Sequence, residues 1–155
     1  MITSYRFILF ICLILLSACS GNEPVKDSQL ALMKTTNPNP VSITNKKHGD
    51  RVGEIKKDVS SLPELYDVAV IKGKKDTLVV YKVKHLHRFR MKAIEKNVNK
   101  MLEEKYPKEN FTVSSDYKIF LEAVRLKEHI KQPDFSDQKA EKRFKEIVKM
   151  TEDMK

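Results

Sequence analysis

The four histidines and two cysteines are the residue types in this chain most often used for metal binding or nucleophilic chemistry. His85 and His87 lie two residues apart in the stretch HLHRFR, so an extended segment can place both imidazoles on one side. Zinc sites normally use three or four protein ligands, and no third ligand stands at a recognisable spacing. Glu103 and Glu104 have no assignable acid/base partner, and the chain has no glycine-rich phosphate loop. We therefore expect no metal site, no cofactor and no enzymatic activity.

The cysteines belong to an apolar stretch at the start of the chain. Ten apolar residues, Phe7 to Leu16, follow Arg6 and include Cys12. A membrane-spanning helix needs about 20 such residues, so this run is too short to cross a bilayer and is typical of a secretory signal. Cys12 would leave with the signal, and Cys19 alone cannot form a disulfide within the mature chain. A secretory signal followed by a free thiol, or an uncleaved anchor, are the alternatives.

The end of this stretch, Leu16-Ser17-Ala18-Cys19, resembles the lipobox of bacterial lipoproteins. The resemblance implies cleavage between Ala18 and Cys19 and attachment of a diacylglyceryl group to the Cys19 thiol. Two acyl chains hold a protein stably on a membrane. Residues 1–18 are thus expected to be a signal peptide. Residues 19–47 are expected to be a flexible tether, because Asn37-Pro38-Asn39-Pro40 disfavours helix. A flexible chain of this length has a root-mean-square reach of roughly 30 Å.

From residue 48 to residue 132 the hydrophobic pattern predicts one small α+β domain. Apolar residues three and four apart predict helices over 48–62, 89–105 and 116–132, with Asp116 as the cap of the last. The β-branched runs LYDVAVIK and TLVVYKVK flank a short polar link and predict a hairpin, and 111–115 is a third strand. The order is α-β-β-α-β-α. We expect a three-stranded sheet covered on one face by helices, with these side chains buried together: Val68, Val79, Val83, Ile94, Val98 and Phe120.

The hydrophobic pattern of residues 133–155 predicts a separate C-terminal amphipathic helix, capped by Ser136. Its six bases are balanced by six acids, whereas interfacial membrane helices usually have a strongly basic polar face. Docking onto the domain or onto a partner is therefore the expected use of this helix.

The run ELYDVAVIKGKKDTLVVYKVK, the following helix, Pro107, the strand FTVSSD and the helix after Asp116 resemble the YhcN/YlaJ sporulation lipoproteins of spore-forming Bacillales. The resemblance covers about residues 48–131, and the lipobox agrees with it. The Lys-dense hairpin and the bulky HLHRFR stretch depart from the pattern. The resemblance implies a lipoprotein that is made during sporulation and retained in the spore envelope, at the inner spore membrane.

Positive charge is concentrated in one window of the chain. The formal net charge is +9, and residues 72–92 contain eight bases and one acid, Asp76. The bases are Lys72, Lys74, Lys75, Lys82, Lys84, Arg88, Arg90 and Lys92. Such a patch can bind anionic lipid, wall polymer or an acidic spore-envelope protein. The other interpretation is a solvated strand edge whose lysines prevent edge-to-edge pairing. Nucleic acid is not an expected partner of an exported protein.

Two hypotheses of function follow from these features. In the first, the protein is a lipid-anchored structural or interaction lipoprotein of the spore envelope, held on the extracytoplasmic face and assisting spore assembly or germination. In the second, it is an exported, membrane-tethered module that binds or acts on a cell-wall polymer. The first hypothesis is favoured because no nucleophile, paired acid or metal set can be assigned.

Overall fold

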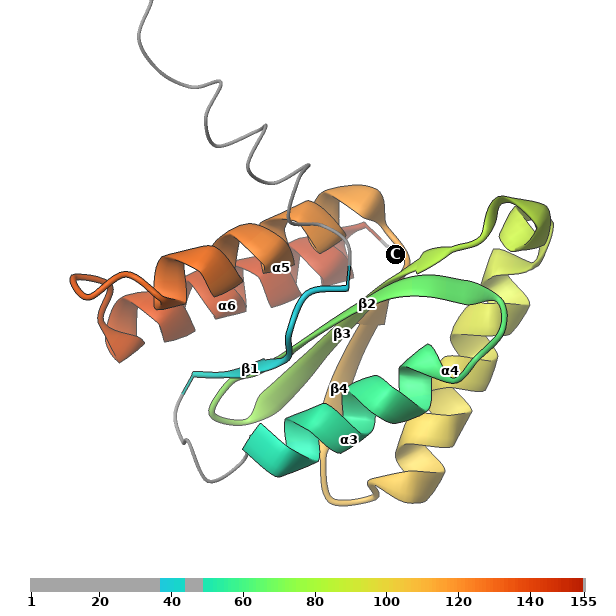
Figure 1. The fold of residues 1–155 in the computed structure, drawn as a ribbon, viewed down its shortest axis with the longest axis horizontal. Coiled ribbons are helices and arrows are strands. Elements are labelled where there is room, and N and C mark those ends of the chain that lie inside the picture. The colour runs from blue at the N-terminus through green and yellow to red at the C-terminus, as the bar shows by residue number, and fades with distance from the viewer. Residues whose placement is uncertain (1–36, 44–48, 155) are drawn as a thin grey trace, which may run out of the picture. The chain divides into compact units, whose positions relative to one another are not determined.

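A mixed four-stranded sheet with helices on both sides forms the domain (Figure 1). The computed structural model describes residues 37–43 and 49–154. The expected signal peptide, Cys19 and most of the expected tether lie outside the described residues. The α+β class is confirmed. The elements are β1 (Val41–Ser42), α3 (Gly49–Ser60), β2 (Leu65–Lys72), β3 (Asp76–Val83), the 3-10 helix η3 (His85–Arg90), α4 (Met91–Lys105), β4 (Asn110–Ser114), α5 (Tyr117–Ile130) and α6 (Asp137–Asp153).

The strands follow the chain order β1-β2-β3-β4 across the sheet. β2 and β3 pair antiparallel, which confirms the predicted hairpin, and Leu65 lies opposite Val83 at its open end. β1 runs parallel to β2, and β4 runs parallel to β3. Each parallel pair is joined through a helical connection, because parallel neighbours need a crossover. The connection is α3 between β1 and β2, and η3 followed by α4 between β3 and β4.

The prediction of three strands was wrong by one. β1 comes from the range 19–47 that the sequence predicted as a tether, and Val41 pairs with Ile71 of β2. The amide of Ile43 also donates to the carbonyl of Lys72, at 2.9 Å. A strand of two residues after an Asn-Pro repeat has no periodic pattern, and its pairing depends on the free edge that β2 offers.

The expectation of one covered face was also wrong, because buried side chains fill both faces of the sheet. Val68, Val70, Val79, Tyr81 and Val83 pack under α3 and α4. On the other face, Ala69, Ile71, Leu78 and Val80 pack under α5 and α6. The apolar runs VAVI in β2 and LVVY in β3 are continuous, which is typical of strands buried on both sides. That pattern was the available signal for a second layer of helices.

Five of the six predicted core residues lie together beneath α3 and α4, whereas Phe120 belongs to the opposite cluster. Phe120 was placed in the wrong cluster for the same reason, because α5 covers the face of the sheet that was predicted to be open to water. Both clusters and every strand pairing lie within residues 37–154. This part of the chain, within the unit Ala31–Lys155, therefore contains a complete core.

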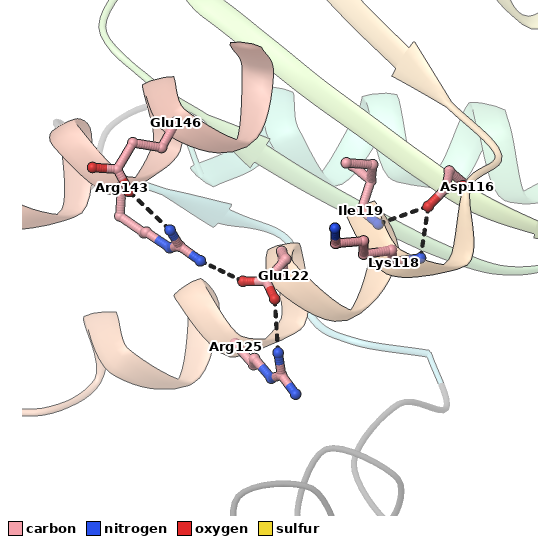
Figure 2. A network of polar contacts seen from close by, with 7 residues as sticks. All are labelled: Asp116, Lys118, Ile119, Glu122, Arg125, Arg143 and Glu146. Carbon is pink, nitrogen blue, oxygen red and sulfur yellow. Dashed lines mark hydrogen bonds and ion pairs between the residues drawn. The ribbon is translucent and has the colours of Figure 1, made fainter. Parts of the chain in front are cut away.

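The C-terminal helix α6 docks on the domain, lying against α5 and burying Phe144 and Ile147. Arg143 on α6 joins the two helices, because it donates to Glu122 of α5 at 2.6 Å (Figure 2). It also donates to Glu146 of its own helix at 2.8 Å (Figure 2). The predicted caps are confirmed. The Asp116 carboxylate accepts from the amides of Lys118 and Ile119 at the start of α5 (Figure 2). Ser136 accepts from the amide of Lys139 at the start of α6.

Candidate functional site

The eight bases of the sequence-derived patch divide between two ends of the sheet. Lys72, Lys74 and Lys75 lie at or beside the turn between β2 and β3. The other five lie where β3 ends and in the segment that follows it. Lys82 lies opposite Asp67, five residues along β2 from Lys72, so the nearest members of the two groups are about 17 Å apart at roughly 3.3 Å per residue. The bases therefore do not form one continuous patch.

Lys72 and Lys82 already have acidic partners inside the domain. Lys72 pairs with Glu109, which also accepts a hydrogen bond from the Thr77 hydroxyl at 3.1 Å. Lys82 donates to Asp67 at 3.1 Å, and only 12% of its side chain is exposed. The Lys82 ammonium also lies 4.4 Å from the centroid of the Phe120 ring. Lys82 thus joins β3 to β2, and Lys72 joins β2 to the residue before β4. That either lysine also contacts a partner stays a prediction.

The bases of the segment 84–92 are placed differently. Lys84, Arg88, Arg90 and Lys92 are all exposed, and none makes a salt bridge within the part of the chain that the structure describes. No acidic residue stands between residues 84 and 92. Four positive charges therefore remain uncompensated at this end of the sheet.

Large apolar side chains are exposed at the same end. Phe89 is 99% exposed and Leu86 is 87% exposed, both on η3, and Met91 follows at the start of α4. Tyr66 on β2 and Tyr117 on α5 are each about half exposed. We call this surface the apolar–basic end and define it by Tyr66, Lys84, Leu86, Arg88, Phe89, Arg90, Met91, Lys92 and Tyr117.

The apolar members of this surface were not predicted from the sequence. From the sequence, HLHRFR was interpreted as a bulky stretch with a possible pair of imidazoles and two bases of the patch, Arg88 and Arg90, and no role was assigned to Leu86 or Phe89. The available signal was the alternation of Leu86 and Phe89 with bases in a segment that belongs neither to the strand pattern nor to the helix pattern. The second predicted helix was expected to begin at Phe89, but α4 begins at Met91 and η3 precedes it.

A cleft of about 490 Å³ opens within the apolar–basic end. Its lining residues are Tyr66, Lys82, Val83, Arg88, Met91, Ser115, Asp116 and Tyr117. Two of its three ionisable groups other than tyrosine are engaged, because Lys82 pairs with Asp67 and the Asp116 carboxylate caps α5. Arg88 remains available to an anionic group. The cleft can bind an apolar or anionic group, and its lining contains no histidine or cysteine for acid/base or nucleophilic catalysis.

A second groove, of about 440 Å³, lies between α3 and α4 and contains a phenol–carboxylate pair. The Tyr106 hydroxyl donates to Asp58 at 2.8 Å. Burial, together with this hydrogen bond, raises the pKa of Tyr106 to about 12. Burial also acts to raise the pKa of Asp58, but hydrogen bonds from Tyr106 and Lys105 outweigh it and lower that pKa. The pair therefore keeps its proton on the phenol at neutral pH and ties α4 to α3.

The histidines form no metal centre in the described part of the chain. His85 and His87 lie on η3, and within residues 37–43 and 49–154 no three side chains of His, Cys, Asp or Glu are grouped to hold a metal ion. None of the helices that the structure describes is long and apolar enough to cross a membrane.

No family model, no curated protein and no solved structure matches the chain.

Proposed function

We propose that this protein is a lipid-anchored lipoprotein of the spore envelope with a structural or interaction role and no enzymatic activity. It is attached through a diacylglyceryl group on Cys19 to the extracytoplasmic face of a membrane, the inner spore membrane. Its task is to assist spore assembly or germination by binding a macromolecular partner. The anchor is supported by the short apolar run and by Leu16-Ser17-Ala18-Cys19. The link to sporulation is supported by the resemblance to the YhcN/YlaJ family.

The observation that carries the interaction role is the apolar–basic end. Phe89 and Leu86 are almost fully exposed, and four uncompensated bases lie on the same segment or beside it. Contiguous exposed apolar surface is typical of interaction sites on folded proteins, because it stabilises nothing within the chain itself. The engaged state of Lys82 and Asp116 in the cleft agrees with a binding role rather than a catalytic one.

A polymer-binding role is the second candidate, and the 490 Å³ cleft favours it. The half-exposed rings of Tyr66 and Tyr117 offer flat apolar surfaces, and Arg88 offers a positive charge. These groups suit a chain-like anionic ligand such as a wall polymer. In this alternative the cleft, rather than the tip of η3, makes the main contact.

The time of expression distinguishes the two candidates. An epitope-tagged copy under its own promoter is followed by immunoblotting through growth and sporulation. We expect the protein to appear only in the developing forespore and to remain with the membrane fraction of the mature spore. Equal amounts in growing cells would contradict the spore-envelope role and favour a general wall-binding function.

A further inference from the structure

The 3-10 helix η3 presents its two apolar side chains on one side. Leu86 and Phe89 are three residues apart, and side chains at positions i and i+3 eclipse one another in a 3-10 helix. No residue of η3 is buried. The two side chains therefore form one projecting apolar tip that neither core of the domain uses.

The charged residues of the chain segment that carries this tip, residues 84–92, are all basic. Lys84 precedes η3, Arg88 and Arg90 lie within it, and Lys92 follows it. Apolar residues that enter a bilayer boundary, flanked by bases that meet anionic headgroups, are typical of surfaces that lie on membranes. The half-exposed Tyr66 and Tyr117 line the cleft together with Arg88 of η3, and tyrosine is enriched at the level of the headgroups.

The point where the chain enters the domain favours a lipid surface over a protein partner. The amide of Asn37, the first described residue, donates to Asp67 at 2.8 Å, and Asp67 pairs with Lys82 in the wall of the cleft. The chain thus enters the domain at the end of the sheet that carries the tip. Residues 20–36 separate Asn37 from Cys19, and a chain of that length spans at most about 60 Å. The hairpin with Lys74 and Lys75 lies at the opposite end of β2 and β3.

We propose that the apolar–basic end docks on the anionic lipid surface to which the protein is anchored, with Leu86 and Phe89 entering the interface and Lys84, Arg88, Arg90 and Lys92 contacting headgroups. The position of the anchor rests on the proposed function. The lipid contact itself rests on exposed residues of the described domain. The acyl chains and the tip then form two membrane contacts at one end of the molecule, and they fix which end faces the bilayer.

The first test is cosedimentation of the chain Ala31–Lys155 with vesicles. It lacks the apolar run and Cys19, so lipidation plays no part in the result. We expect binding to phosphatidylglycerol mixed with phosphatidylcholine, weak binding to phosphatidylcholine alone, and loss of binding as salt increases. Each base near an anionic surface contributes about fivefold to binding, so Arg88→Glu/Arg90→Glu should lower the partition coefficient at least tenfold. Phe89→Ala should lower it about tenfold through lost apolar burial.

The matched control is Lys74→Glu/Lys75→Glu, which makes the same charge change at the opposite end of the sheet. This variant should keep binding within about threefold of the unmodified chain, because its charges lie away from the docked end. Unchanged far-ultraviolet circular dichroism would show that each variant is folded. Equal losses in the two charge-reversal variants would contradict a docked end, as would absence of binding at low salt.

The second test measures depth and uses the lipidated protein itself. The chain has no tryptophan, so Phe89→Trp introduces a single fluorophore at the tip. In anionic vesicles we expect a blue-shifted emission that lipids with brominated acyl chains quench, whereas Lys75→Trp should show neither effect. An unshifted emission for Phe89→Trp would contradict insertion. So would crosslinking of Phe89→Cys, in spores, to an acidic protein instead of lipid.

The experiments distinguish a failure of the anchor proposal from a failure of the docking proposal. If the protein carries no lipid but Ala31–Lys155 still binds anionic vesicles through the tip, the anchor is wrong and the lipid contact stands. If the protein is lipidated but the tip variants bind vesicles as the unmodified chain does, the docking proposal is wrong and the anchor stands.

Discussion

Lys72 and Lys82 belong to the same dense window as Arg88, but each is held by a carboxylate that lies elsewhere in the sequence, Glu109 and Asp67. Glu109 is 37 residues from Lys72, so only the pairing of β3 with β4 brings the two together. The cap at Asp116 was predictable, because its partners are the next backbone amides along the chain.

The Lys72–Glu109 pair leads to a prediction about acid stability. Burial acts to raise the pKa of Glu109, but hydrogen bonds from Lys72 and Thr77 and the charges of Lys72 and Arg51 outweigh it and lower the pKa below the ordinary 4.5. A lowered folded-state pKa stabilises the protein above pH 4.5, and this stability is lost as the pH falls through the lower folded value. We expect Glu109→Gln to reduce the free energy of unfolding at neutral pH by about 1–3 kcal/mol.

Urea denaturation between neutral pH and about pH 3 measures this effect, over the range in which a carboxyl titrates. The difference between Glu109→Gln and the unmodified chain should shrink as the pH falls. Glu104→Gln is the matched control, because Glu104 is 66% exposed and lies 3.8 Å from Lys100. Its cost should stay below about 0.5 kcal/mol. A difference for Glu109→Gln that does not depend on pH would show that its charge does not stabilise the fold.

At the scale of elements, periodic patterns in the sequence predicted the individual helices and strands. They did not predict which face of the sheet each helix covers. The stripe of Val52, Ile55 and Val59 correctly identified α3, and the two β-branched runs identified β2 and β3. β1 was missed because two residues carry no period. The second covered face was missed because hydrophobic patterning shows which side of a helix is buried but not which face of a sheet it covers.

The contact between the hairpin and α6 supplies a prediction at this scale. A Cβ atom on Gly73 would stand 2.6 Å from Cε1 of the Phe144 ring, well inside normal contact distance. We expect Gly73→Ala to destabilise the protein by about 1–3 kcal/mol, because the ring and α6 must move. The smaller side chain of Phe144→Leu relieves the clash, so a double-mutant cycle between the two positions should give a coupling energy of at least about 0.5 kcal/mol.

Gly53 in α3 is the matched control for this substitution, because nothing lies within 4 Å of its added Cβ. Gly53→Ala should stabilise the protein by up to about 1 kcal/mol through helix propensity alone. Chemical denaturation of the two alanine variants compares them directly. Equal stability changes of the same sign would contradict the close packing of α6 against the hairpin.

The whole domain has two unlike ends. The hairpin end is closed by α6, whose Glu141 accepts from the amide of Lys74 at 3.2 Å. The other end carries the exposed tip of η3 and receives the chain at Asn37. The sequence contained every residue of the apolar–basic end, but Tyr66 and Tyr117 join Arg88 and Met91 only through folding. The anchor shows the opposite case, since its prediction depends entirely on the local pattern that ends at Cys19.

Metabolic labelling with a fatty acid tests the central claim, anchorage through Cys19, most directly. The full-length protein, Cys19→Ser and the control Cys12→Ala are expressed in a spore-forming bacterium, labelled, separated into membrane and soluble fractions, and immunoprecipitated. We predict label and membrane association for the unmodified protein and for Cys12→Ala, because Cys12 lies within the expected signal peptide. Cys19→Ser should carry no label and should either become soluble or remain an uncleaved precursor. Label that persists in Cys19→Ser would contradict the account.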